Sequence, residues 1–306
     1  MLLKEGSSGD LVVRLQKGLA HLGLLQGAPD GKFGPKTEDA VEAFQTAHDL
    51  YADGVFGRGS AAAYNPLVPD ECKVDLGAPA GQVLVPSTRL RLVTVPCTVF
   101  KGKSGYGSMQ LRADVAAKYL PFYEEVKALG GGISSAGSLR ALHSGGGSAQ
   151  SATSLHYPAI AFDLALGTGM QSLADPYLIE SLGERRQRVW MRCDGGEERK
   201  FQAIIASSPG GVLKIQKQTV TAKVVDFTAL AQKHGFYPIR ARKAFKPGGS
   251  YEAAEWWHFQ CEGVLVPGVS TFGSELLKVY PEATIRNSFR GDWDKVRGCV
   301  WGEDWN

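Results

Sequence analysis

The chain has 306 residues and 43% of them are hydrophobic, which is enough for two compact domains or one large one. Its formal net charge of +3 is too small to indicate nucleic acid binding, so we expect no nucleic acid partner. No segment approaches the roughly 18 consecutive apolar residues typical of a membrane helix, so we expect no membrane span.

The first residues bear on where the protein is made, and the cysteines bear on thiolate metal sites and disulfides. Met1 to Glu5 runs directly into Gly6 without the apolar stretch of a secretory signal. We therefore expect no signal peptide and synthesis in the cytoplasm. The five cysteines are an odd number without Cys-x-x-Cys spacing, which argues against a thiolate zinc site and a full disulfide framework.

Residues 1–66 have the pattern of a separate helical unit. Leucines recur at helical spacing from Asp10 to Leu22, and two further helical segments follow before residue 66. The sequence Asp-Gly-x-Phe-Gly occurs between these segments twice, beginning at Asp30 and at Asp53. Each copy predicts a turn that needs glycine and buries one phenylalanine. We therefore expect an all-α three-helix bundle over residues 1–66.

This unit resembles the small peptidoglycan-binding module found in many cell-wall hydrolases. The resemblance rests on Leu15-Gln16, the repeated Asp-Gly-x-Phe-Gly turn and Ala43-Phe44-Gln45. It implies peptidoglycan as a partner. The unit has six basic against eight acidic residues, so such binding should depend on hydrogen bonds and aromatic contacts rather than on bulk charge. A bundle kept only for stability is the alternative.

The chain after this unit predicts a linker and a mixed domain. Residues 67–88 contain several prolines and little periodicity, which is typical of a linker. Residues 89–306 form the second domain. Its predicted elements are a strand within 90–100, a helix over 111–129 in which Pro121 leaves open a kink or a division into two, a short strand within 133–142, a hairpin at 194–196 and a helix over 226–234. Together they predict an α+β domain with an antiparallel sheet.

Two clusters in this domain contain candidate metal ligands. The first contains His156 and Asp163, and the second contains Glu255 and His258. Histidine nitrogen and carboxylate oxygen are the ligands of a catalytic zinc that keeps one position open for water. Two histidines and one aspartate therefore form a chemically plausible site, and the glutamate would be the base beside it.

The local pattern places these side chains. From residue 159 to 166 bulky apolar residues alternate with small or charged ones, which predicts a strand with Asp163 on a face of alanines. His156 lies just before Pro158, so we expect it in the loop that enters the strand. Glu255 and His258 are three residues apart and would face opposite ways on one strand. We therefore place Glu255 in the preceding turn.

These clusters resemble the signatures of the zinc D-Ala-D-Ala peptidases, which cut peptidoglycan stem peptides. Residues 154–163 match Ser-x-His-x-x-Gly-x-Ala-x-Asp except that Ala159 replaces the glycine, and residues 255–258 match Glu-x-x-His. The resemblance implies Zn²⁺ bound by His156, Asp163 and His258, with Glu255 as the catalytic base. The substitution at Ala159 should affect loop shape more than metal binding.

Three further roles follow from the same resemblance. Ser138-Leu139-Arg140 looks like a family element whose arginine holds the substrate carbonyl or carboxylate, which makes Arg140 a second catalytic candidate. An ordinary surface arginine is the alternative. Ser154 and Trp256 are the expected substrate-binding residues.

The predicted function is hydrolysis of cell-wall stem peptides by metal-activated water, in a monomer released from the cytoplasm to the wall like a phage endolysin. The alternatives are a D-Ala-D-Ala carboxypeptidase of bacterial wall remodelling and a non-enzymatic peptidoglycan-binding protein. The long segment between the two clusters, residues 177–225, should form a wall or lid beside the site. The sequence leaves open which peptide bond is cut.

Overall fold

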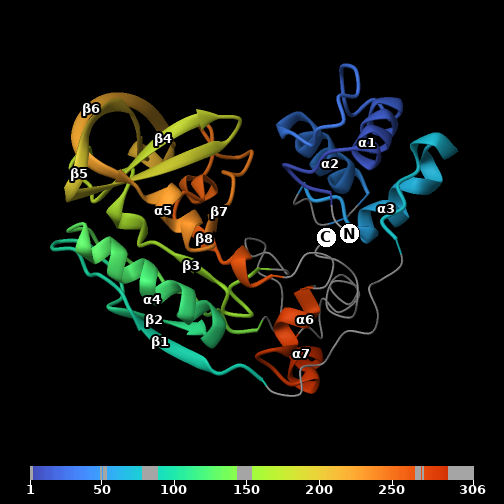
Figure 1. Cartoon of the computed structure of the whole chain (residues 1–306). Coiled ribbons are helices and arrows are strands. Elements are labelled where there is room, and N and C mark those ends of the chain that lie inside the picture. The colour runs from blue at the N-terminus through green and yellow to red at the C-terminus, as the bar shows by residue number, and fades with distance from the viewer. Residues whose placement is uncertain are drawn as a thin grey trace. The chain divides into compact units, whose positions relative to one another are not determined.

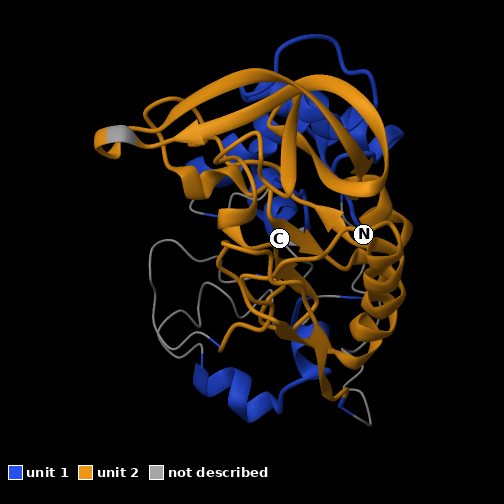
Figure 2. Cartoon of the chain, turned by 90° about the vertical axis from the view of Figure 1, so that its left-hand side faces the viewer, with its two compact units in different colours: residues 1–89, 142–154, 266–306 blue, residues 90–141, 155–265 orange. Residues whose placement is uncertain are grey.

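The computed structural model describes residues 3–48, 50, 54–77, 89–142, 154–265, 270 and 272–288. The chain divides into two compact units (Figure 2). Unit 1 comprises Met1–Arg89, Leu142–Ser154 and Val266–Asn306, and unit 2 comprises Leu90–Ala141 and Leu155–Leu265. Residues 266–306, expected in the second domain, thus group with the first. Within the described ranges, no helix has the length and apolarity that a membrane span requires.

Unit 1 begins with the helices expected from the leucine spacing and the repeated turns. They are α1 (Asp10–His21), α2 (Pro35–Ala47) and α3 (Arg58–Tyr64) (Figure 1). The glycines of the two turns, Gly31 and Gly54, have φ angles of +69° and +77°, a backbone conformation that favours glycine. The phenylalanines that follow, Phe33 and Phe56, are buried in the core. Both turn predictions are therefore confirmed.

Two buried glutamines hold these turns in the same way. The side-chain oxygen of Gln16 accepts a hydrogen bond from the Gly31 amide at 2.8 Å. The side-chain oxygen of Gln45 accepts one from the Gly54 amide at 2.9 Å, and its nitrogen donates to the Val55 carbonyl at 2.9 Å. The glutamine thus satisfies backbone groups that the turn leaves without a partner, which explains why Gln accompanies each Asp-Gly turn.

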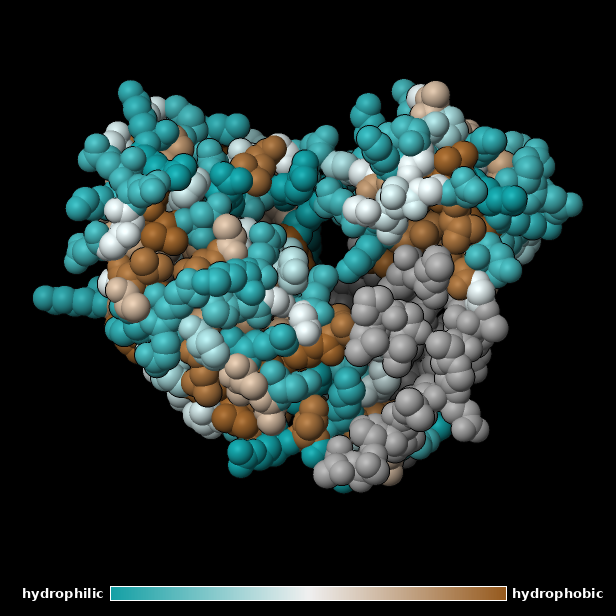
Figure 3. Space-filling view, in the orientation of Figure 1, coloured by the Kyte–Doolittle hydropathy of each residue, from teal (hydrophilic) through white to brown (hydrophobic). Residues whose placement is uncertain are grey.

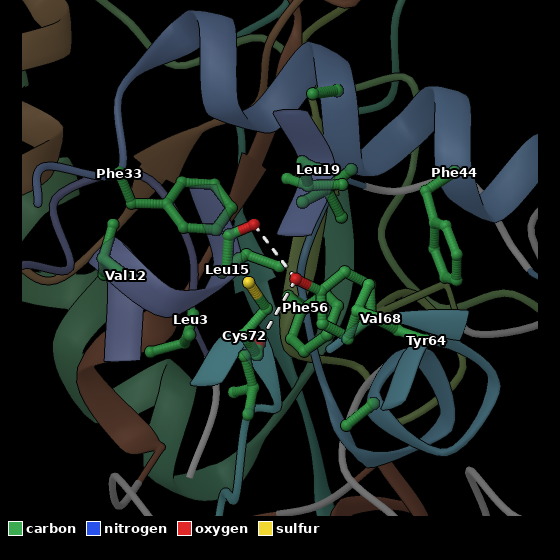
Figure 4. Packing of buried hydrophobic residues seen from close by; sticks show 14 of the residues in the cluster. Leu3, Val12, Leu15, Leu19, Phe33, Phe44, Phe56, Tyr64, Val68 and Cys72 are labelled. Carbon is green, nitrogen blue, oxygen red and sulfur yellow. Dashed lines mark hydrogen bonds between the residues drawn. The ribbon is translucent and has the colours of Figure 1, made fainter. Parts of the chain in front are cut away.

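The core of unit 1 extends beyond the expected boundary at residue 66 (Figure 4). The Tyr64 hydroxyl lies 3.2 Å from the Leu15 carbonyl and 3.4 Å from the Cys72 carbonyl. Further along, Val74 and Leu76 are buried in the same cluster. Residues 67–77, predicted as part of a linker, therefore pack on the helices, because their apolar side chains cover the core. Residues 78–88 lie outside the described ranges.

Gly18 in α1 allows this tyrosine to approach the helix. A Cβ atom at Gly18 would lie 1.7 Å from the Tyr64 hydroxyl oxygen. Alanine in place of a helical glycine ordinarily stabilises by about 0.5–1 kcal/mol. Here we expect Gly18→Ala to lower the free energy of unfolding by about 1–3 kcal/mol, because the buried ring cannot move away.

Denaturant unfolding of the two glycine variants would test this expectation. Gly59→Ala in α3 is the matched control, since no described atom beyond its chain neighbours and its own helix backbone lies within 4 Å of the added Cβ. This control should be neutral or slightly stabilising. A stabilising effect of Gly18→Ala would contradict the packing described here.

Unit 2 contains three small antiparallel sheets. The first pairs β1 (Leu92–Pro96) with β2 (Ser108–Arg112), and α4 (Ala113–Ala128) lies along both strands (Figure 1). The second has the order β3-β8-β7, formed by β3 (Ala161–Asp163), β8 (His258–Gln260) and β7 (Tyr237–Pro238). The third has the order β4-β5-β6, formed by β4 (Tyr177–Gly183), β5 (Arg186–Ser207) and β6 (Lys214–Asp226). The α+β expectation with antiparallel pairing is confirmed.

An aromatic core supports the central sheet. Phe162 of β3 and Phe259 of β8 are cross-strand partners whose rings stack at 5.8 Å. Tyr119 of α4 contacts Phe162 edge-on, and Phe236 contacts the rings of both Tyr119 and Phe162. Because side chains alternate along a strand, the residues next to these phenylalanines point to the opposite face of the sheet. Asp163 and His258 are those neighbours.

The other helices complete the two units. In unit 2, α5 (Phe227–Lys233) follows Asp226, which caps the helix because its side chain accepts a hydrogen bond from the Ala229 amide. In unit 1, α6 (Phe272–Leu277) and α7 (Glu282–Ser288) are the last described helices. The single helix α4 runs through Pro121, where the sequence left a break open.

Two predictions in this domain are wrong. Residues 133–142 form no strand beyond an isolated bridge between Gly137 and Asp163. The hairpin expected at 194–196 is a bulge inside β5, because Arg192 and Glu197 both pair with Val224. A Cβ at Gly196 would lie 2.7 Å from the Val224 backbone, so these glycines permit a close backbone approach rather than a chain reversal.

The chain reverses instead between β4 and β5. Glu184 and Arg185 have φ angles of +49° and +63°, the left-handed conformation of a tight hairpin turn. The visible face of the β4-β5-β6 sheet is mostly hydrophilic (Figure 3).

Candidate metal centre

Three predicted ligand atoms converge in unit 2. His156 Nε2 lies 3.1 Å from His258 Nδ1 and 3.2 Å from Asp163 Oδ1, and His258 Nδ1 lies 3.0 Å from the same oxygen. Ligands bound tetrahedrally to zinc at about 2.0–2.1 Å stand about 3.3 Å apart. The three atoms therefore have nearly the mutual spacing that a tetrahedral ion requires. Acceptor atoms this close also repel one another unless a proton or a cation lies between them.

The strand register brings two of the ligands together. Asp163 of β3 and His258 of β8 are directly opposite each other in the antiparallel pair. They share the face opposite the stacked phenylalanines, so burying the aromatic rings fixes both ligands on the other side. A slip of one residue would turn either ligand into the core. The convergence of Asp163 and His258 thus follows from the hydrophobic pattern around them.

The third ligand comes from the turn before β3, as expected. His156 is buried, and its Nδ1 lies 2.5 Å from the Ser138 carbonyl oxygen. Nδ1 therefore donates its proton to that carbonyl, which leaves the Nε2 lone pair for a metal. The turn closes through a hydrogen bond from the Ala159 amide to the His156 carbonyl, with Ala159 at φ +55°. A left-handed residue explains why the family signature has glycine at this position.

The charge of the site is set by Asp163. Burial opposes ionisation of this carboxyl, yet its close contacts with the imidazoles of His156 and His258 hold its pKa well below its usual range. Asp163 is therefore a carboxylate at neutral pH. Two imidazole nitrogens and one carboxylate oxygen form a donor set that suits Zn²⁺.

Glu255 lies in the turn before β8, as the spacing predicted. It ends the short 3₁₀ helix Tyr251–Ala254 in the left-handed conformation, with φ +52° and ψ +12°. Its carbonyl accepts a hydrogen bond from the His258 amide at 3.1 Å, which links it directly to a ligand-bearing residue. A buried acidic residue in this sparsely populated region is the kind of strain that clusters at functional sites.

One contact of Glu255 was not anticipated from the sequence. Arg242 Nε lies 2.6 Å from Glu255 Oε1. Arg242 occurs in the run Arg240-Ala241-Arg242-Lys243, which has no periodicity or motif that distinguishes it from a solvated basic segment. Ser138 was likewise known only as part of the Arg140 element, and a backbone carbonyl has no sequence signal.

The remaining predicted residues have different surroundings. The Arg140 amide donates to the His156 carbonyl at 3.2 Å, and its guanidinium lies 6.0 Å from the centre of the Tyr157 ring. This places Arg140 beside the metal-binding turn. Ser154 is half-buried two residues before His156. Trp256 is only 1% exposed and packs against Gly169 and Tyr177, which favours a packing role over contact with substrate.

Comparison with known proteins identifies the N-terminal region. Residues 8–63 match a family described as "Putative peptidoglycan binding domain". The chain carries a domain of this family. The peptidoglycan-binding domain thus coincides with the region of α1, α2 and α3 and includes both Asp-Gly-x-Phe-Gly turns.

Two further proteins are similar to the chain. A zinc D-Ala-D-Ala carboxypeptidase of Streptomyces albus G is 44% identical over 73 residues, which are 23% of this chain and 28% of that protein. The chain therefore spans less than a third of the length of that relative. A crystal structure of a fused Zn-dependent amidase/peptidase/peptidoglycan-binding domain-containing protein from Clostridium acetobutylicum is 17% identical, covering 76% of this chain and 87% of that chain. Its TM-score of 0.21 is too low to support any argument about the fold.

Proposed function

We propose that the chain is a zinc-dependent peptidase that hydrolyses the stem peptides of peptidoglycan. The observation that carries this proposal is the convergence of His156, Asp163 and His258, with Glu255 in the adjoining turn. The peptidoglycan-binding domain at residues 8–63 supports the choice of substrate. The partial likeness to a zinc D-Ala-D-Ala carboxypeptidase supports both the metal and the reaction class.

The residues of the site have distinct roles in such a reaction. Zinc, when bound, would polarise the scissile carbonyl and lower the pKa of the attacking water. Glu255 takes a proton from this water and passes it to the leaving amine, as a general base and then a general acid. The carbonyl of Ser138 holds His156 in the tautomer that presents Nε2 to the metal.

Arg140 would stabilise the negative charge that develops on the carbonyl oxygen. The Arg140 amide donates a hydrogen bond to the His156 carbonyl, so the Arg140 side chain begins beside the turn that contains this candidate ligand. A charged donor at this place is typically worth a few kcal/mol in the transition state. We further propose that Ser154, at the entry to the same turn, contributes to substrate binding.

Two types of peptidase are candidates, and they differ in which bond of the stem peptide they cut. An endolysin-like enzyme, with a three-helix module that binds the wall, would cut stem peptides within intact peptidoglycan. A D-Ala-D-Ala carboxypeptidase is the second candidate, because the curated relative bears that name. Mass spectrometry of fragments from purified peptidoglycan would separate them, since the carboxypeptidase releases only terminal D-Ala. Unchanged fragments, with the Glu255→Gln protein as the blank, would contradict both.

The contribution of the peptidoglycan-binding domain can be measured separately. A tethered binding domain raises the concentration of an enzyme at its substrate without altering its chemistry. Deleting residues 1–77, which contain the buried cluster formed around α1, α2 and α3, should strongly reduce lysis of intact sacculi. It should leave cleavage of a small soluble stem peptide nearly unchanged.

Two outcomes would count against the targeting role. Equal loss on both substrates would mean that residues 1–77 support the catalytic fold. Failure of the isolated residues 1–77 to sediment with insoluble peptidoglycan would mean that the domain does not bind the wall.

A further inference from the structure

Within the part of the chain that the structure describes, Arg242 is the cation that contacts the carboxylate of Glu255. Its side chain is 8% exposed, whereas that of Arg242 is 56% exposed, so the arginine reaches a buried carboxylate from the surface. The contact joins Nε to Oε1 at 2.6 Å, which is the distance of a strong charge-assisted hydrogen bond. Only one carboxylate oxygen takes part in it. The other oxygen, Oε2, takes no part in this bond.

The backbone around Arg242 is also tied to the turn that contains the base. The Arg242 amide donates to the Ala253 carbonyl at 2.8 Å, two residues before Glu255. The backbone and the side chain of Arg242 therefore both bind residues 253–255. A left-handed residue such as Glu255 has no helix or strand to fix its side chain, so a second point of attachment is needed to define the position of its carboxylate.

The segment that carries Arg242 is itself attached to the β4-β5-β6 sheet. The Ala241 amide donates to the Arg185 carbonyl at 3.0 Å, and the Arg185 guanidinium returns a bond to the Ala241 carbonyl at 3.3 Å. The Gly248 amide donates to the Leu213 carbonyl at 3.1 Å. Arg185 lies in the β4–β5 turn and Leu213 in the β5–β6 connection. The β4–β5 turn and the β5–β6 connection are thus both hydrogen-bonded to the segment 241–248.

We propose that Arg242 is a positioning residue for the carboxylate of Glu255, and that the β4-β5-β6 sheet serves as the scaffold that holds it. This inference rests on the proposed function, in which Glu255 is the base. It gives residues 177–225 a role in catalysis through Arg242 rather than as a lid over the substrate. A base displaced by about 1 Å loses on the order of 10²-fold in rate, so a scaffold of this kind has a large effect.

Steady-state kinetics on a soluble stem peptide would test the proposal with intact protein. Arg242→Ala should lower kcat by about 10- to 100-fold, since the base keeps its chemistry but loses its fixed position. KM and zinc content should stay near the wild-type values, because Arg242 is not one of the candidate metal ligands and its proposed role concerns the base alone. Arg242→Lys should recover part of the loss, since lysine supplies one donor of the same charge.

Chemical rescue separates positioning from a general effect on folding. Because the Arg242 side chain is more than half exposed, methylguanidine added to Arg242→Ala should reach the carboxylate and raise kcat. The matched control is Arg199→Ala, which removes a similarly exposed arginine that pairs with Glu197 at 2.9 Å in the same sheet. This control should show wild-type kcat and no response to methylguanidine.

Each contrary result has a defined meaning. Wild-type kcat in Arg242→Ala, beside an inactive Glu255→Gln, would overturn this inference alone. A loss of kcat that neither lysine nor methylguanidine relieves would also overturn it, because it would show a structural role. Full activity in Glu255→Gln would instead remove the proposed function on which the inference rests.

Discussion

Replacing His258 by alanine should lower both the zinc content and the hydrolytic activity of the protein. His258 supplies one of three ligand atoms, and its ring is in contact with that of His156. Loss of an outer-shell partner alone typically lowers metal affinity 10- to 100-fold, so loss of a ligand should exceed about 100-fold. Metal analysis of the purified variant after dialysis would measure this directly. His156→Ala and Asp163→Ala should behave in the same way.

A histidine elsewhere in unit 2 provides the control. His234 lies at the end of α5 and bonds to Glu125 at 2.7 Å, which is a structural contact. His234→Ala should keep its zinc even if its stability falls. Thermal unfolding would confirm that the His258→Ala protein is folded when its metal is measured. Full zinc occupancy in folded His258→Ala would rule out the assignment of this ligand.

Glu255→Gln should retain zinc and lose at least about 10²-fold in turnover, the usual contribution of a positioned general base. Glutamine has the shape of glutamate and can still accept the hydrogen bond from Arg242, so the turn should be preserved. It cannot accept a proton from water. The loss should appear in kcat, with little change in metal content.

The nearby carboxylate of Glu252 is the matched control. Glu252 is exposed on the 3₁₀ helix Tyr251–Ala254 that Glu255 terminates. Glu252→Gln should therefore turn over like the wild type. If Glu252→Gln lost turnover and Glu255→Gln kept it, Glu252 would be the base instead of Glu255.

The candidate ligand set could be proposed from the sequence because it lies in two short segments, residues 154–163 and 255–258, that resemble the zinc peptidase signatures. Alternation around Asp163 and the three-residue spacing from Glu255 to His258 give each side chain a direction, and the register of β3 with β8 needs only the stacked phenylalanines. The Asp-Gly turns of unit 1 could be predicted for the same reason. In each case a few adjacent residues contain the whole physical constraint.

What escaped prediction depends on contacts between distant segments. Arg242 is marked only by its bond to Glu255, and no short-range pattern distinguishes it from neighbouring basic residues. The glycines at 195 and 196 have the composition of a turn, but the strand that passes beside them makes them a bulge. The packing of Cys72 and Leu76 on the helices overrides the proline-rich composition that suggested a linker.

The pairing of His156 with His258 has a consequence for how the chain is held together. The two residues are 102 positions apart, and the whole β4-β5-β6 sheet lies in the loop between them. An ion bound by both would act as a removable cross-link across that loop. In the chain-entropy view, a covalent link closing about 100 residues removes close to 5 kcal/mol of freedom from the unfolded chain. A chelator would then act on unit 2 as a reductant acts on a disulfide-bonded domain, by opening the loop of 102 residues that the ion closes.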